Sequence, residues 1–165
     1  LPIYIKYIEK MKGWINMCNN NTETNSGNCI AETLKVIQIL QQNVCPESGL
    51  DSCDRPMLGG SPNCIVCNTR PIMLYTCAGN GTPFSMPTTK DATTDCTATG
   101  ATNCSTVFRV EKVDNNCATF RVLVANADST TEPYLSTNSF FTMNLNCCCA
   151  IRCLNDCFVD NICNN

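Results

Sequence analysis

The sequence predicts a mainly β protein with an N-terminal helix (α+β), in which one or two short helices precede an antiparallel β-sandwich. Apolar residues recur at the helical spacing up to Pro46, whereas from Arg70 onward they alternate with polar residues as they do in half-buried strands. Residues 107–124 add two alternating runs joined by a short polar turn, which is typical of a β-hairpin.

Composition divides the 165 residues into three parts: an N-terminal arm and linker (1–27), a helix plus β-sandwich assembly domain (28–156) and a cysteine-containing C-terminal tail (157–165). In the arm, residues 3–15 carry an apolar stripe at helical spacing and predict a short amphipathic helix. This helix either reaches a membrane surface or a partner, or packs on its own domain. A third alternative is that the biological chain starts at Met17.

A second, more secure helix is predicted over residues 29–44. Asn28 is suited to cap its start, and Pro46 prevents its continuation. Its apolar stripe consists of Ile30, Leu34, Ile37, Leu40 and Val44. Residues 47–63 are rich in Gly, Ser, Pro and Asp and predict a loop.

The β region begins with a strand over residues 70–77. Residues 87–106 follow as a surface excursion with at most a short strand. The clearest hairpin joins 107–113 to 117–124; with Val113 opposite Cys117, the pairs Val110/Phe120 and Phe108/Val122 share one buried surface. On the other surface Arg109 lies opposite Arg121 with Glu111 diagonal to it, which we interpret as a solvated or interface charge cluster rather than a catalytic site.

After a loop over 128–137, residues 140–154 predict one last long strand. Its alternation places Cys148 on the face opposite Cys147 and Cys149, which share a face with Phe141, Met143, Leu145 and Ile151. The three consecutive cysteines therefore cannot all serve one buried cluster. Beyond the strand, Cys153, Cys157 and Cys163 lie on a short polar tail.

Cysteine is the dominant chemical feature, with 16 residues and no histidine. The missing imidazole argues against an ordinary hydrolase and against most catalytic zinc sites, and the sequence predicts neither an enzyme nor a bound cofactor. A domain of this length does not need so many disulfides to fold, so we expect bonds between chains as well as within one. The candidates are Cys18, Cys29, Cys45, Cys53, Cys64, Cys67, Cys77, Cys96, Cys104, Cys117, Cys147, Cys148, Cys149, Cys153, Cys157 and Cys163.

Charged residues make up 15% of the chain and its net charge is −3. This balance offers no electrostatic surface for nucleic acid, and its weak repulsion favours self-association. The sequence shows no run of the length a membrane span needs and no signal-peptide pattern, although the cysteine content indicates an oxidising destination.

Two other functions fit the thiols less well. Cys64 and Cys67 form a C-x-x-C pair that a zinc module would use, with a second pair from Cys149/Cys153 or Cys153/Cys157. A thiol–disulfide oxidoreductase would place the same pair at the start of a helix, whereas here a predicted strand follows.

Several segments together resemble the CotY/CotZ/ExsY family of bacterial endospore outer coat and exosporium proteins. They are Cys29 to Pro46, Asn68 to Tyr75, Gly81 to Phe84, Val107 to Val113, Cys117 to Leu123 and Asn144 to Leu154. The most specific is Cys149-Ala-Ile-Arg-Cys153-Leu154, where the family signature has Gln in place of Arg152.

The resemblance implies a structural protein, made in the mother-cell cytoplasm and placed in the outer coat, crust or exosporium basal layer of the spore. It implies self-assembly into a two-dimensional lattice hardened by disulfides, with other spore coat or exosporium proteins as further partners. From their predicted positions outside the sheet core, we expect Cys18, Cys29, Cys157 and Cys163 to bond between subunits.

Overall fold

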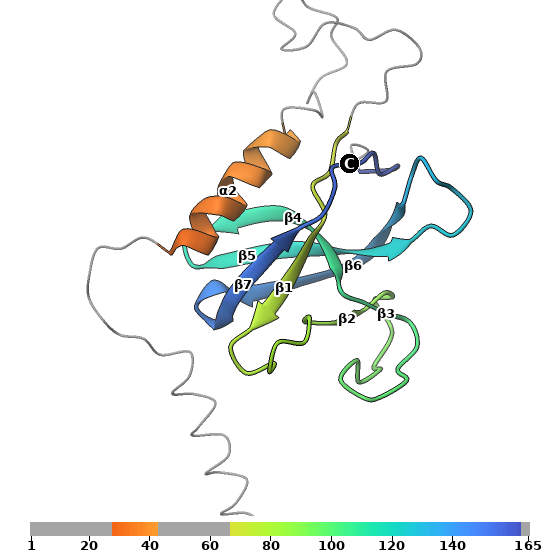
Figure 1. Ribbon diagram of the computed structural model, residues 1–165, viewed down its shortest axis with the longest axis horizontal. Coiled ribbons are helices and arrows are strands. Elements are labelled where there is room, and N and C mark those ends of the chain that lie inside the picture. Colours follow the sequence, from red (N-terminus) through yellow and green to blue (C-terminus); the bar gives the residue numbers. More distant parts are fainter. Residues whose placement is uncertain (1–27, 43–66, 163–165) are drawn as a thin grey trace, which may run out of the picture.

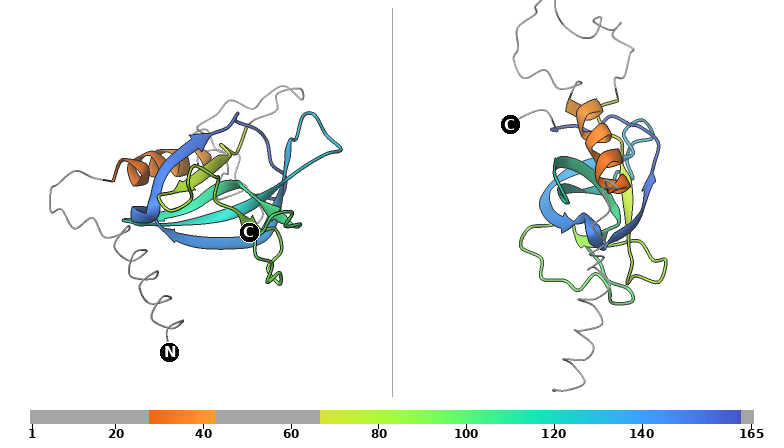
Figure 2. Two further views of the ribbon diagram at one scale, coloured as in Figure 1. Left: turned by 60° about the horizontal axis from the view of Figure 1, so that its bottom comes forward. Right: turned by 90° about the vertical axis from the view of Figure 1, so that its left-hand side faces the viewer.

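The computed structural model describes residues 28–42 and 67–162. One helix is followed by strands that form a five-stranded antiparallel sheet in the order β6-β5-β4-β1-β7 and a two-stranded sheet of β2 and β3 (Figure 1). The predicted mainly β fold with a helix near the N-terminus is confirmed. The five-stranded sheet is strongly curved, and the helix lies across one side of it (Figure 2).

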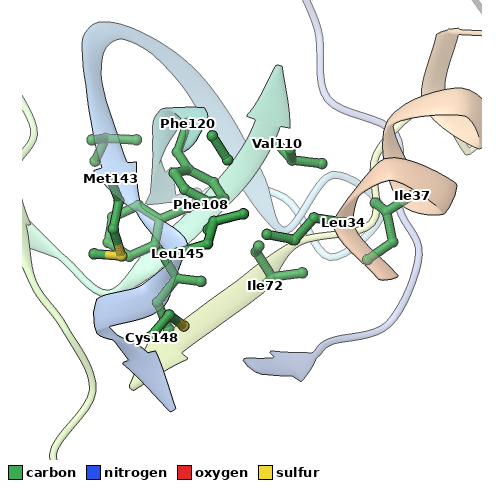
Figure 3. Close-up of a cluster of buried hydrophobic side chains, with 12 residues drawn as sticks. Leu34, Ile37, Ile72, Phe108, Val110, Phe120, Met143, Leu145 and Cys148 are labelled. Atoms are coloured by element: carbon green, nitrogen blue, oxygen red, sulfur yellow. The ribbon is translucent and has the colours of Figure 1, made fainter. Parts of the chain in front are cut away.

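Helix α2 (Cys29–Gln42) confirms the predicted second helix. The Asn28 side-chain oxygen accepts hydrogen bonds from the backbone N–H groups of Ile30 (3.1 Å) and Ala31 (3.3 Å), as an N-cap does. Leu34 and Ile37 point into the core (Figure 3). The predicted stripe is wrong at Leu40, which is 49% exposed, because the next residue along the helix is buried in its place.

That buried residue is Gln41, which joins the helix to the sheet. Its side-chain NH2 donates to the Val110 carbonyl (2.8 Å), and its side-chain oxygen accepts from the Arg70 N–H (3.0 Å). One turn earlier, the Gln38 side-chain oxygen accepts from the Val113 N–H (2.9 Å). Strand β1 pairs with β4 only at Ile72 and Phe108. Beyond that pair, the glutamine side chains of α2 form hydrogen bonds with backbone groups of β4.

The strands are β1 (Ile72–Thr76), β2 (Met86–Pro87), β3 (Cys104–Ser105), β4 (Val107–Asp114), β5 (Cys117–Ala125), β6 (Tyr134–Asn144) and β7 (Cys148–Cys153). The first strand lies where the sequence predicts it. The excursion over 87–106 contains only Pro87 of β2 and the two-residue strand β3. Met86 of β2 packs against the main core, so this small sheet helps to cover it.

The β4–β5 hairpin pairs Val110 with Phe120 and Phe108 with Val122, as predicted. The predicted pairing of Val113 with Cys117 is wrong: Val113 pairs with Ala118, and Asp114 pairs with Cys117. The turn is one residue shorter because Asn115 adopts a φ of +50°, a conformation that Asn tolerates. A register shift between Val110 and Lys112 compensates for the difference.

The predicted single strand over 140–154 is two strands. A short 3-10 helix, η1 (Leu145–Cys147), separates β6 from β7 and is capped by the Asn144 side chain. This reversal brings β6 and β7 to the two opposite edges of the sheet. The strand β6 also starts earlier than predicted, within the expected loop over 128–137.

The main core lies between α2 and the curved sheet, and Figure 3 shows its buried hydrophobic side chains. Phe141 stands at the centre of an aromatic group, with ring centroids 4.9 Å from Phe108, 5.2 Å from Phe120 and 5.5 Å from Phe84. The predicted helix over residues 3–15 and the predicted loop over 47–63 lie outside the described residues. No helix among residues 28–42 and 67–162 has the length and apolar character that crossing a membrane requires.

Candidate functional site

Two disulfides join pairs of cysteines within residues 67–162. Cys77, just after β1, bonds to Cys149 on β7, with α-carbons 5.1 Å apart and 72 residues between them in sequence. Cys96 bonds to Cys104 within the excursion, with α-carbons 5.8 Å apart and a separation of 8 residues. Both α-carbon distances suit a disulfide. The first bond fixes an edge strand of the main sheet, and the second closes a surface loop.

The consecutive cysteines occupy three different environments. Cys147 lies in η1, where its carbonyl accepts from the Cys77 N–H (3.2 Å), and Cys149 is exposed and bonded to Cys77. Cys148 is buried in the main core. Cys148 and Cys149 therefore face opposite ways, as alternation predicts. The prediction that Cys149 shares a face with Met143 and Leu145 is wrong, because those two residues are buried, Cys149 is exposed, and η1 interrupts the strand between them.

Cys148 is a structural thiol. Its side chain is 6% exposed and donates to the Ala150 carbonyl (3.3 Å). Burial raises its pKa above the usual value, although two backbone hydrogen bonds oppose the rise. Since the thiolate is the reacting species, this thiol is protected from oxidation.

Within residues 28–42 and 67–162, four other cysteines are both free and exposed: Cys29 at the start of α2, Cys67 ahead of β1, Cys117 at the start of β5 and Cys153 at the end of β7. They lie at the ends of elements rather than inside them. These positions leave each thiol accessible to a second molecule.

Cys157 does not belong to this exposed set. It is 6% exposed and pairs with Thr69, whose N–H donates to the Cys157 carbonyl (3.1 Å) while the Cys157 N–H donates to the Thr69 carbonyl (3.0 Å). Burial, together with the nearby charges of Cys67 and Asp156, raises its pKa to about 11. The prediction that Cys157 lies on a polar tail outside the core is wrong, because Cys157 packs with Leu123, Val159 and Ile162 in a second buried cluster.

The charge cluster of the hairpin is buried rather than solvated. Arg109 is 5% exposed; its guanidinium donates to Glu111 (2.7 Å) and to Thr69 Oγ1 (3.1 Å). Arg121 donates to the second Glu111 oxygen (2.7 Å) and lies over the Phe140 ring, 4.5 Å from its centroid. Burial lowers the pKa of Arg109 from its usual value, although Glu111 opposes the change. One carboxylate therefore holds two guanidinium groups in place.

A small hollow of about 50 Å³ lies where the end of α2 meets the segment before β1. Its lining includes Leu40, Gln41 and the exposed Cys67. Arg70 and Asp156 form a two-point ion pair beside it, with both N–O distances 2.6 Å, and this hydrogen bonding lowers the pKa of Asp156.

The described residues do not favour the two alternative functions, a zinc module and a thiol–disulfide oxidoreductase. No group of three or more Cys, Asp or Glu side chains within 28–42 and 67–162 is arranged to hold a metal ion. Cys149 is bonded to Cys77, so the Cys149/Cys153 pair does not offer two thiolates. Cys67 is followed by a β-bridge and β1 rather than by a helix, which disfavours the redox motif. Cys64, like Cys18, Cys45, Cys53 and Cys163, lies outside the described residues.

The sequence analysis missed two features of helix α2. Gln41 is buried, and the apolar side chains of Val36, Ile39 and Leu40 are exposed. The sequence nevertheless indicated a second apolar face on this helix, because Val36 and Ile39 lie outside the predicted apolar stripe.

The model of the CotZ spore coat family, described as spore coat protein Z, matches residues 17–134 of the chain. No curated protein and no solved structure gives a significant match to it.

Proposed function

Because this chain belongs to the CotZ family of spore coat proteins, we propose that it is a structural subunit that assembles with copies of itself into a two-dimensional layer and is then cross-linked by disulfides. The role is structural and not catalytic. The layer is part of the outer coat, crust or exosporium basal layer, and the subunit is made in the mother cell. Other coat or exosporium proteins are its further partners.

The observation that carries this proposal is the division of the thiols. Among the described residues, Cys148 and Cys157 are buried, and two cysteine pairs are bonded to each other. The thiols of Cys29, Cys67, Cys117 and Cys153 are exposed and free. A folded domain that keeps several thiols on its surface has covalent attachment points for its neighbours. The fold itself needs none of them, since its core is built from apolar side chains.

Assembly precedes cross-linking in this proposal. A disulfide forms only where α-carbons come within about 7 Å and the Cβ vectors face each other, so complementary surfaces must first place the cysteines. Low net charge and a polar surface leave little repulsion between copies.

The test is to purify the full chain from a reducing cytoplasm and image it by electron microscopy before and after oxidation. Sheets or stacks are expected before oxidation. After oxidation, boiled samples should resist separation until reductant is added, and then yield monomer on a gel. Monomer alone in boiled samples without reductant would show that covalent cross-linking is absent, and soluble monomers that assemble only after oxidation would reverse the proposed order.

A further inference from the structure

Helix α2 presents an apolar face to solvent on the side away from the core. Val36 is 57% exposed, Ile39 50% and Leu40 49%. Within the described residues only Leu135 and Phe140 are comparable exposed large apolar side chains, and both lie on β6. The helix therefore carries most of the exposed apolar surface of this kind, and Figure 1 shows it on the outside of the domain.

An exposed, unbonded thiol lies at each end of this face. Cys29 is the first residue of α2, and Cys67 shares the hollow with Leu40 near the other end. The rise of about 1.5 Å per residue separates Cys29 from Leu40 by about 16 Å along the helix. This distance is far beyond the reach of a disulfide, so Cys29 and Cys67 of one chain cannot bond to each other.

We propose that the α2 face binds the same face of a second copy around a two-fold axis, with the helices antiparallel, and that Cys29 of each copy then bonds Cys67 of the other. This inference rests on the proposed function and specifies one contact of the layer. A two-fold axis makes the contact self-complementary, so the same pair of thiols occurs at both ends of the helix pair.

The charges of the helix favour the antiparallel arrangement. Glu32 and Lys35 are its charged residues, and both are exposed. When Cys29 lies level with Leu40 of the second copy, Glu32 lies level with the partner's residue 37, about 3 Å along the axis from the second Lys35. A parallel pair would instead place Glu32 beside Glu32 and Lys35 beside Lys35, and would align the helix dipoles unfavourably.

The size of the face explains why thiols accompany it. A 14-residue helix is about 21 Å long and about 10 Å wide. Two such faces bury on the order of 400 Å² in total, well below the roughly 1,200 Å² of a stable interface. The helix contact alone is therefore reversible, and the two symmetric disulfides make it permanent.

The oxidant is a small-molecule disulfide, RSSR. The Cys29 thiolate attacks one of its sulfurs, which forms a mixed disulfide and releases one RS⁻; the Cys67 thiolate of the second copy then attacks the Cys29 sulfur and releases the other. The two protons lost by the cysteines pass to the released thiolates. Two protein thiols are thus oxidised to one disulfide while RSSR is reduced to two RSH.

The experiment mixes ordinary and ¹⁵N-labelled full-length chains under reducing conditions, lets them assemble, oxidises them with glutathione disulfide and maps disulfide-linked peptides by mass spectrometry. A Cys29–Cys67 peptide is expected, with mixed-label forms as frequent as uniformly labelled ones. A uniformly labelled peptide alone would place the bond within one chain and overturn the inference. Absence of the peptide from cross-linked sheets would overturn it too, while leaving the proposed function standing; absence of both sheets and cross-links would remove the proposed function itself.

Matched variants test the helix face directly. Ile39→Asp places a charge at the centre of the proposed contact and should lower the yield of the Cys29–Cys67 bond about tenfold or more. Leu135→Asp changes a comparably exposed residue on β6 and should leave the yield unchanged. Both substitutions are at exposed positions, and circular dichroism checks that the fold is kept. Equal effects of the two substitutions would contradict the proposed contact.

Residues 1–16 of the same chain are the competing occupant of this face. If they cover it, the intact chain will give no mixed-label Cys29–Cys67 peptide, and a chain lacking residues 1–16 will give one. That pair of results would overturn the inference. If the second copy binds the face, the intact chain gives the peptide.

Discussion

Replacing Glu111 by Gln should destabilise the fold more than any other single loss of charge in the described residues. Glu111 accepts a 2.7 Å hydrogen bond from each of Arg109 and Arg121, whose side chains are 6% and 11% exposed. The variant keeps the size of the side chain but leaves two guanidinium groups close together without a counter-charge. Breaking a buried ion pair by removing one partner costs about 3–5 kcal/mol, and the 22% exposure of Glu111 places the expected loss near 3 kcal/mol.

The chain supplies its own control in the ion pair between Arg70 and Asp156. Its N–O distances of 2.6 Å are at least as short, but its side chains are 37% and 44% exposed. Exposed pairs of this kind contribute about 0–1 kcal/mol, so Asp156→Asn should be mild. The two variants therefore separate the effect of burial from the effect of hydrogen-bond geometry.

The assay is urea unfolding of the soluble full-length chain at low concentration, followed by circular dichroism. With a slope of about 2 kcal/mol per molar urea, Glu111→Gln should lower the midpoint by about 1.5 M and Asp156→Asn by less than about 0.5 M. A midpoint for Glu111→Gln at or above that of Asp156→Asn would refute the assignment of the cluster as buried and structural.

Three further outcomes are expected in unfolding experiments of the same kind. Phe120→Ala removes a fully buried ring and should cost about 3–5 kcal/mol, whereas Phe140→Ala, at a ring that is 46% exposed, should cost far less; similar midpoints would contradict the core assignment. Cys77→Ser opens a bond spanning 72 residues and should cost about 4 kcal/mol, against about 2.5 kcal/mol for Cys96→Ser, whose bond spans 8, and the reverse order would contradict the loop-entropy account. Folding raises the pKa of Cys157 from 9.0 to about 11, so its contribution to stability is complete below pH 9 and is lost as the pH rises to 11; Cys157→Ala should flatten this alkaline decline, and an unchanged decline would show that another group causes it.

The confirmed predictions rest on local sequence patterns that are compatible with only one structure. The N-cap at Asn28 and the alternation over residues 107–124 are properties of neighbouring residues, so the helix start and the pairing of Phe108 with Val122 could be read directly. The turn could not, because the choice between a two- and a three-residue loop depends on the φ of Asn115 and on a bulge that restores the register farther along. The alternation of apolar and polar residues does not reveal the bulge that offsets the shorter turn.

The other failures depend on contacts between segments that are distant in sequence. Residues 140–154 alternate almost without interruption, and nothing in that pattern marks the 3-10 turn that divides them; the turn needs the Asn144 cap and the Leu145 N–H, which donates to the Asn116 carbonyl (2.7 Å). Gln41 is polar yet buried, because backbone groups of β4 and of Arg70 supply its partners. Exposure of Leu40 follows from the same contact.

Burial decides which thiols of the folded protein can react with a second molecule. An oxidant meets only those thiols that reach the surface and form the thiolate, and both conditions exclude Cys148 and Cys157, whose pKa values burial raises. Cys77 and Cys149 are bonded to each other and offer no thiol. Folding therefore limits which thiols are accessible for bonds to a second molecule. The main core is formed by apolar side chains of α2 and the sheet, and the two disulfides that join described residues lie at an edge strand and in a surface loop.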